Sequence, residues 1–254
     1  MFERFVAVGD SFTEGVGDDD PAYPNGVRGW ADRVAESLAA ATPALGYANL
    51  AVRGRLLEQV LAEQLDPVLA LRPDLVTLYA GGNDLMRPRP DVDRLAEAYD
   101  EAVGKLAASG ATVVLFTGVD GVEDPVFRKM RGRTAVYNEH VRLIAAQHGA
   151  LVVDMWAMRE LRDRRMWSDD RIHLGPHGHR AVATAVLDVL GARDLPRPAE
   201  LPPVPAAAPA QRRREDLRWI RSHVVPWIHR RLTGTSSGDG ITPKRPTPEP
   251  VTPR

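Results

Sequence analysis

Short apolar runs alternate along the chain with longer stretches in which hydrophobic residues recur at helical spacing. Apolar runs of this length are typical of strands buried on both faces, because helices cover both sides of a parallel sheet. The predicted strands are residues 5–8, 47–50, 75–79, 112–116 and 150–153. The predicted helices are residues 30–41, 56–69, 92–108, 134–147 and 177–190. This alternation predicts an α/β fold with a mainly parallel sheet.

The pattern changes after residue 194. Residues 195–211 form a run rich in proline and alanine, which favours extended chain over packed structure and is interpreted as a linker. Residues 212–232 return to helical spacing, whereas residues 233–254 are rich in Gly, Ser, Thr and Pro and are predicted to be a disordered tail. One domain over residues 1–194 is therefore expected to hold the core, with a helical extension and a tail behind it.

Composition narrows the chemistry open to the chain. With 33 basic against 34 acidic residues the formal charge is -1, so nucleic acid is not an expected partner. The absence of cysteine excludes disulfides, a thiol nucleophile and zinc sites built on thiolates. Covalent catalysis would then fall mainly to Ser, Thr or Lys.

The N-terminal sequence shows no targeting segment. The apolar run at residues 5–8 leads directly into Gly9-Asp10-Ser11, which leaves no room for a charged region, an apolar core and a cleavage site. No apolar run approaches the roughly 20 residues that span a bilayer. A cytoplasmic protein is the expectation.

Ser11 is the first candidate for chemistry. It lies just past the first predicted strand, between Gly9 and Gly15. A tight loop there would present its hydroxyl at the carboxyl edge of the sheet, where open α/β sheets bind their ligands. Taken alone, a serine in a glycine-rich turn is more often structural.

Two further polar motifs strengthen that candidate. Gly82-Asn83-Asp84 follows the third predicted strand, and Asn83 can aim an amide outward, which suits an oxyanion hole. Asp170 stands three residues before His173, so that one loop can pair the carboxylate with the imidazole and fix its tautomer. A plain turn and a solvated surface pair are the alternatives for each motif by itself. Their joint occurrence in strand-end contexts favours catalysis.

Four short motifs together resemble the blocks of the SGNH/GDSL hydrolase family, in order and over residues 5–190. They are Gly9-Asp10-Ser11, Gly54 after Asn49, Gly82-Asn83-Asp84 and Asp170-Arg171-Ile172-His173. The resemblance implies that Ser11 is the nucleophile, that His173 is its base and that Asp170 orients His173. It also implies an oxyanion hole made from the backbone N–H groups of Ser11 and Gly54 and the side chain of Asn83.

The resemblance also implies a fold and an activity. The fold would be a three-layer α/β/α flavodoxin-like sandwich around a five-stranded parallel sheet of order 2-1-3-4-5, with residues 1–194 as the catalytic domain. The activity would be hydrolysis of lipid-like or simple acyl esters through an acyl-Ser11 intermediate, without a cofactor. No metal is expected either, because His177 and His179 near His173 are not accompanied by carboxylates at ligand spacing.

Other functions could use the same residues. An acyltransferase or a carbohydrate deacetylase would show the same motifs, since only the acceptor or the leaving group differs. A flavodoxin-like module that binds a phosphate or nucleotide in the loop of Ser11 is the alternative from a different class. The sequence does not define the oligomeric state.

Residues 212–232 leave three uses open. Seven arginines stand there against two acidic residues, and four apolar residues recur at helical spacing. A helix docked on the catalytic domain is the commonest use of such a stripe. A lid over the acyl pocket and a peripheral contact with an anionic membrane are the alternatives.

Overall fold

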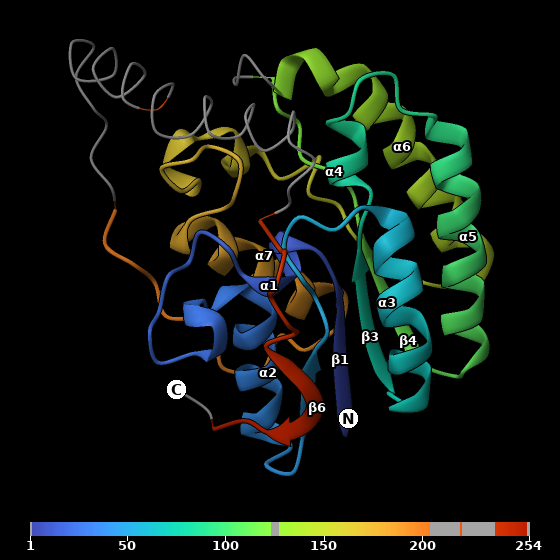
Figure 1. Cartoon of the computed structure of the whole chain (residues 1–254). Coiled ribbons are helices and arrows are strands. Elements are labelled where there is room, and N and C mark those ends of the chain that lie inside the picture. Colours follow the sequence, from blue (N-terminus) through green and yellow to red (C-terminus); the bar gives the residue numbers. More distant parts are fainter. Residues whose placement is uncertain (1, 123–126, 204–218, 220–236, 253–254) are drawn as a thin grey trace.

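The computed structural model describes residues 2–122, 127–203, 219 and 237–252. In this part of the chain the strands are β1 (Arg4–Gly9), β2 (Gly46–Asn49), β3 (Leu75–Tyr79), β4 (Thr112–Phe116), β5 (Leu151–Val153) and β6 (Arg245–Pro250). They form one six-stranded sheet in the order β5-β4-β3-β1-β2-β6 (Figure 1). The first five strands run parallel, and β6 pairs antiparallel with β2 at the edge.

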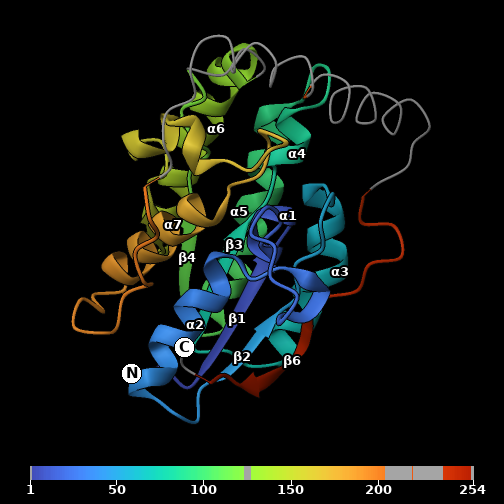
Figure 2. The same cartoon turned by 90° about the vertical axis from the view of Figure 1, so that its left-hand side faces the viewer.

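Helices cover both faces of the sheet (Figures 1 and 2). The described helices are α1 (Ser11–Glu14), α2 (Gly29–Ala41), α3 (Leu57–Ala70), α4 (Gly82–Leu85), α5 (Val92–Ala108), α6 (Phe127–His148) and α7 (Pro176–Val189). Short 3-10 turns occupy Pro24–Gly26, Arg159–Arg162 and Arg164–Met166. α2 and α7 pack together on one face, whereas α3, α5 and α6 pack on the other. The result is a three-layer sandwich.

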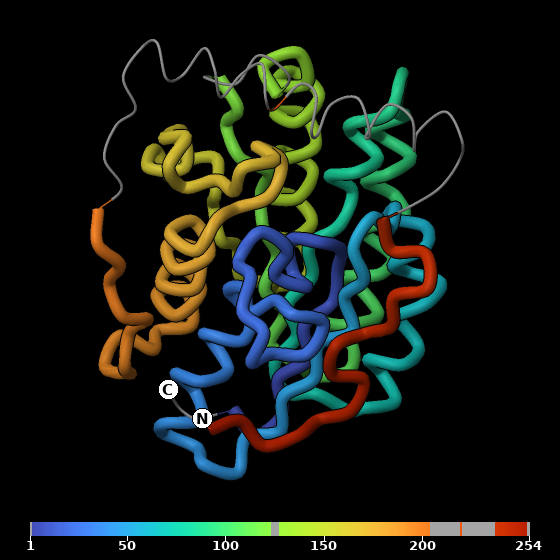
Figure 3. Tube along the Cα trace, turned by 60° about the vertical axis from the view of Figure 1, so that its left-hand side comes forward, coloured from blue at the N-terminus to red at the C-terminus, as the bar shows by residue number. Residues whose placement is uncertain are grey.

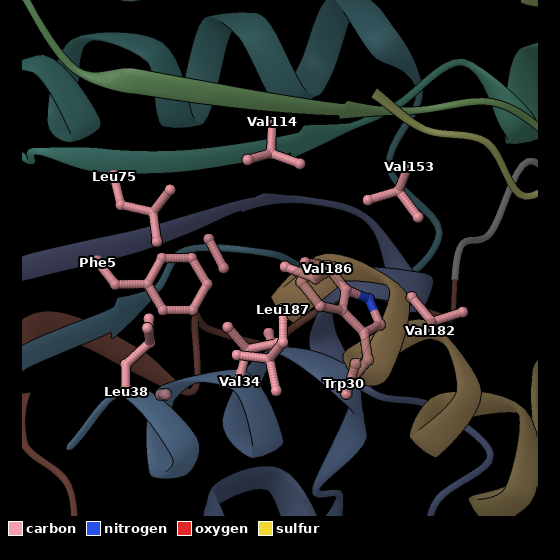
Figure 4. Packing of buried hydrophobic residues seen from close by; sticks show 14 of the residues in the cluster. Phe5, Trp30, Val34, Leu38, Leu75, Val114, Val153, Val182, Val186 and Leu187 are labelled. Atoms are coloured by element: carbon pink, nitrogen blue, oxygen red, sulfur yellow. The ribbon is translucent and has the colours of Figure 1, made fainter. Parts of the chain in front are cut away.

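Successive side chains of β1 point to opposite faces of the sheet and so belong to two separate apolar layers of the core. Phe5 and Ala7 belong to the layer under α2 and α7, while Val6 and Val8 belong to the opposite one. Figure 4 shows the first layer, in which the fully buried Trp30 lies among the valines of α7. Each fully buried large apolar side chain contributes about 1.5–3 kcal/mol, so the strands that lead to the carboxyl edge are held firmly on both sides.

The predicted parallel part of the fold is confirmed. The five predicted strands are present in the predicted order, and the bounds of nine of the ten predicted elements agree to within one residue. The exception is α6, which begins at Phe127 rather than at residue 134. The five-stranded sheet was therefore predicted correctly except at one edge.

The predictions of a purely parallel sheet and of a disordered tail are wrong at residues 245–250, which form β6. Lys244 anchors this strand from a buried position: its Nζ contacts Asp32 Oδ2 at 2.5 Å and donates to the carbonyl oxygens of Arg28 and Val27. The pairing with β2 and the hydrogen bonds of Lys244 to backbone carbonyls offset the entropy lost on ordering, whereas desolvation, which raises the pKa of Asp32, opposes the attraction within the buried ion pair. Figure 3 shows this C-terminal part of the chain, in red, running beside the blue N-terminal part.

The remaining C-terminal predictions lie largely outside the described residues. Residues 196–203 contain no helix or strand. The rest of the predicted linker, and the helical segment 212–232 apart from Trp219, are not described, so both stay predictions. None of the described helices is both long and apolar enough to cross a membrane.

Candidate active site

The first strand brings Ser11 to the carboxyl edge of the sheet. Gly9 ends β1 with φ +152, and a Cβ there would lie 2.4 Å from the carbonyl oxygen of Tyr79. Glycine is therefore required for the close approach of β1 and β3. Asp10 caps α1 by accepting a hydrogen bond from Phe12 N at 3.1 Å, and Ser11 is the first residue of that helix.

Ser11, His173 and Asp170 form a continuous chain of hydrogen bonds. His173 Nε2 lies 2.9 Å from Ser11 Oγ, and His173 Nδ1 lies 2.6 Å from Asp170 Oδ2. Burial of Asp170 opposes its ionisation, but hydrogen bonds from the His173 ring and from backbone N–H groups hold its pKa well below the usual range. The ionised carboxylate favours a proton on Nδ1, which leaves Nε2 free to accept the hydroxyl proton of Ser11.

Hydrogen bonds to the Asp170 carboxylate hold the turn over residues 170–173. Asp170 Oδ1 accepts hydrogen bonds from Ile172 N (2.9 Å), His173 N (3.0 Å) and Ser168 Oγ (2.7 Å). Arg171 takes the left-handed conformation, with φ +61. An aspartate that accepts from the backbone two residues ahead is the standard Asx turn. The spacing of three between Asp170 and His173 is thus explained by local geometry.

Asn83 lies at the neighbouring strand end. Gly81 precedes α4 with φ +96 and turns the chain so that Asn83 falls in the first turn of that helix. Asn83 Nδ2 donates to the carbonyl oxygen of Arg55 at 2.9 Å and to Asp10 Oδ2 at 3.2 Å. The first bond fixes the amide, and the longer second bond is the one that an anionic substrate oxygen can replace.

Gly54 lies in the loop after β2, with φ +77. A buried ion pair missed by the sequence analysis holds this loop: Arg53 Nη2 lies 2.6 Å from Glu14 Oε1, and Arg53 N donates to Glu14 Oε2 at 2.8 Å. Glu14 belongs to α1, the helix that starts at Ser11, and its side chain is fully buried. The pair therefore couples the loop of Gly54 to the helix of Ser11. A single acidic residue near a glycine turn gave no signal of this role.

Asp10 is a second buried carboxyl group at the site. Burial raises its pKa to about 7, although the hydrogen bond from Phe12 N and the nearby His173 partly oppose the rise. Its two oxygens contact Phe12 N and the amide of Asn83. Asp10 thus links the start of α1 to α4.

Ser11, Asn83 and His173 line one pocket of about 100 Å³. A second hollow of about 60 Å³ continues it between α4 and α6. Phe127 lines both, because α6 begins earlier than its sequence pattern predicts. The remaining wall of the first pocket is largely apolar and includes Phe12, Tyr79, Met86, Val119, Met155, Trp167, Ile172 and Leu174.

His179 has structural surroundings. His179 is fully buried, its Nδ1 accepts from Trp30 N at 3.2 Å, and burial lowers its pKa to about 4. Within the described residues, no group of three or more His, Cys, Asp or Glu is arranged to hold a metal ion.

Known proteins resemble the chain in sequence and in fold. The profile of the GDSL-like lipase/acylhydrolase family matches residues 7–181. LAE5, described as an alpha/beta hydrolase enzyme from the metagenome of Lake Arreo, Spain, has 25% identity and a TM-score of 0.62, covering 74% of this chain and 95% of its own. Axe2, an acetylxylan esterase from Geobacillus stearothermophilus, has 23% identity and a TM-score of 0.60 over 74% and 94%. TesA has 23% identity and a TM-score of 0.61 over 74% and 98%.

A search of curated proteins finds no match. The family profile nevertheless spans more than half of the chain, and the matched range contains Ser11, Gly54, Asn83, Asp170 and His173. The solved structures share the same α/β architecture. The chain therefore belongs to the GDSL-like lipase/acylhydrolase family and is a serine carboxylic ester hydrolase.

Proposed function

We propose that this enzyme hydrolyses short-chain carboxylic esters through an acyl intermediate on Ser11. The observation that carries the proposal is the 2.9 Å contact between Ser11 Oγ and His173 Nε2 beside a small apolar pocket. A hydroxyl needs an adjacent base to become a nucleophile, and a third group must orient that base. His173 and Asp170 are in position for these two roles.

In acylation, Ser11 Oγ bonds to the carbonyl carbon of the ester while its proton passes to His173 Nε2. The carbonyl oxygen becomes an oxyanion, stabilised by the N–H groups of Ser11 and Gly54 and by the amide of Asn83. When the tetrahedral intermediate collapses, the bond from carbon to the alcohol oxygen breaks and His173 returns the proton to that oxygen. Asp170 stays ionised and stabilises the imidazolium throughout.

In deacylation, water takes the place of the alcohol. His173 Nε2 accepts a proton from the water as its oxygen bonds to the acyl carbon, and then protonates Ser11 Oγ as the acyl bond breaks. The free acid leaves and Ser11 regains its hydroxyl proton. An alcohol acceptor would make the same site an acyltransferase, so the products must be analysed with and without one.

The pocket size favours a short acyl group. A cavity of 150 Å³ holds a benzene molecule, whereas the pocket beside Ser11 measures about 100 Å³. An acyl chain of about two to four carbons therefore fits without rearrangement of the wall. The adjoining hollow of about 60 Å³ has room for few further methylene groups, and those beyond it would remain in water and add little binding energy.

Deacetylation of a carbohydrate is a second candidate. Acetyl is the smallest of the acyl groups that fit, and Axe2, which has a similar fold, is an acetylxylan esterase. A hydroxyl-rich alcohol would then leave from the open side of the pocket. Acetylated xylo-oligosaccharides and p-nitrophenyl acetate, compared at equal concentration, separate a sugar esterase from an enzyme that recognises the acyl group alone.

The test combines covalent labelling with a chain-length series. Wild type and Ser11→Ala are treated with a fluorophosphonate, with Ser109→Ala as the control for loss of a serine hydroxyl away from the pocket. Only Ser11→Ala should lose labelling and turnover. On p-nitrophenyl acetate, butyrate, octanoate and laurate, kcat/KM should fall beyond butyrate. Labelling of Ser11→Ala, or equal kcat/KM on acetate and laurate, contradicts the proposal.

A further inference from the structure

Trp219 lies outside the family-matched range yet contacts the turn of the catalytic pair. Its indole Nε1 donates a hydrogen bond to the backbone carbonyl oxygen of Asp170 at 2.7 Å. The guanidinium of Arg171 lies over its ring, 4.8 Å from the centroid. Both contacts fall on the two residues that directly precede Ile172 and His173.

Of the segments that form the site, the turn over residues 170–173 is the one that a contact from outside the turn stabilises most. Arg171 occupies the left-handed region, which disfavours residues other than glycine. The side chains of Asp170 and His173 are 24% and 23% exposed, whereas Glu14 beside Ser11 is fully buried. The stack on Trp219 holds Arg171 in its strained conformation, and the indole N–H fixes the peptide group next to it.

Arg197 and Lys244, described residues that come before and after Trp219 in the sequence, are each attached to the catalytic domain. Before it, Arg197 donates to Asp188 Oδ1 (3.0 Å) on α7 and to the carbonyl oxygen of Thr184 (3.1 Å). After it, Lys244 and β6 are fixed as described above. Because the chain is attached to the catalytic domain both before and after Trp219, this residue meets the turn over residues 170–173 at a high effective concentration. The contact therefore needs little binding energy of its own.

We propose that Trp219 is a positioning residue for ester hydrolysis, holding the turn over residues 170–173 so that His173 stays in line with Ser11. This inference rests on the proposed function, because it acts through the roles assigned there to Asp170 and His173. It also gives the extension after residue 194 a part in activity. Of the uses left open for residues 212–232, docking on the catalytic domain is the one that this contact supports.

The test separates the two contacts of Trp219. Trp219→Phe keeps a ring for Arg171 but removes the N–H donor, and Trp219→Ala removes both. The matched control is Trp156→Phe, because the ring of Trp156 also lies against an arginine, Arg131, at 5.2 Å. The measurements are kcat and KM on p-nitrophenyl acetate, the rate of fluorophosphonate labelling, and the melting temperature used to correct each rate for the folded fraction.

The expected result is a loss in kcat without a matching change in KM. Trp219→Phe should lower kcat and the labelling rate by about three- to tenfold, the size of one hydrogen bond. Trp219→Ala should lower them further, and Trp156→Phe should leave them within about twofold of wild type.

Three outcomes overturn the proposal. They are an unchanged kcat in both Trp219 variants, a change in KM alone, and a loss of activity fully explained by unfolding. Ser11→Ala is measured in parallel. If it keeps wild-type activity, the proposed function has failed, whereas its inactivity together with unchanged Trp219 variants means that only the role of Trp219 is wrong.

Discussion

The two sides of the active site are held in different ways. Ser11 and Asn83 follow the buried strands β1 and β3. Partly buried polar contacts join Asn83 to Asp10, the neighbour of Ser11, and join Glu14 of α1 to the loop of Gly54. His173 instead lies in a turn well after β5, supported by hydrogen bonds within the turn and by Trp219. The sheet therefore fixes the proposed nucleophile and the proposed oxyanion donors, while local contacts must fix the proposed base.

This difference predicts which substitutions lower turnover most. A change in the nucleophile side should remove an interaction that nothing nearby replaces. A change in one support of the His173 turn should cost less, because several weak contacts share the task.

The largest effect is expected at Asn83. Asn83→Ala removes the side-chain donor that we propose for the oxyanion, and loss of one such donor costs on the order of 100- to 1,000-fold in turnover. The measurement is kcat and KM on p-nitrophenyl acetate, with KM expected to change little. A variant with more than a tenth of wild-type kcat would remove Asn83 from the oxyanion hole.

Gly17 lies against the turn of His173, at the contact between the two sides of the active site. It has φ +97, and a Cβ there would lie 2.3 Å from the carbonyl oxygen of Leu174 and 3.1 Å from Cβ of His173. Gly17→Ala should displace His173 from Ser11, and a misplacement of about 1 Å can lower turnover by about 100-fold. Gly26→Ala is the control, because Gly26 also has a positive φ (+69) but no atom within 4 Å of the added Cβ.

Backbone strain is common to both glycine variants. Both melting temperatures should therefore fall, that of Gly17→Ala further because of its added clash with Leu174, while only Gly17→Ala should lose kcat per folded molecule. Equal loss of kcat in the two variants would show that strain, and not the contact with the His173 turn, causes the effect.

A smaller effect is expected at Ser168. Ser168→Ala removes one of the hydrogen bonds to Asp170 Oδ1 but leaves those from Ile172 N and His173 N. A hydrogen bond to an ionised group contributes about 1.5–3 kcal/mol, but two backbone donors remain on Asp170 Oδ1, so only part of this should be lost and kcat should fall by about three- to tenfold. Steady-state kinetics beside Ser109→Ala check this. A loss as large as that in Asn83→Ala would mean that the His173 turn has no shared support.

The pH dependence of stability tests the burial of Asp10. Its pKa is about 7 in the folded protein and 3.8 ordinarily, so folding favours the protonated form. The stabilisation is complete below the ordinary value and is lost as the pH rises through about 7. Asp10→Asn should abolish this loss, seen as a smaller drop in the free energy of unfolding between pH 4 and 8.

Two comparisons make that measurement specific. Asp66→Asn, at an exposed position of α3, controls for removal of a carboxyl group. Asp84, whose pKa burial also raises, is present in all variants, so the difference between wild type and Asp10→Asn reports Asp10 together with its repulsion from Asp84. If the free energy of unfolding had the same pH dependence in wild type and in Asp10→Asn, the pKa of the Asp10 carboxyl would not be raised in the folded protein.

The parallel sheet and the motif residues could be predicted from the sequence because their signals are local. Each buried strand is a short apolar run, and Ser11, Asn83 and Asp170 with His173 stand in short motifs. The contacts between distant segments carried no such signal. Arg53 and Glu14 stand 39 positions apart with no motif that links them, and Trp219 lies in a segment with no motif of its own.

Strand β6 was missed for a different reason. Its sequence contains proline at alternate positions, which argues against a central strand. An edge strand tolerates proline, and the buried Lys244 beside it supplies an anchor that composition does not reveal. Composition alone therefore gave the wrong answer for residues 245–250.

The prolines of β6 also affect association between protein molecules. Half of the six residues in this edge strand have no N–H group. A strand from a second molecule would find too few donors there to continue the ladder. β6 thus covers β2 and ends the sheet, so that this edge resists the strand-to-strand association that leads to aggregation at high concentration.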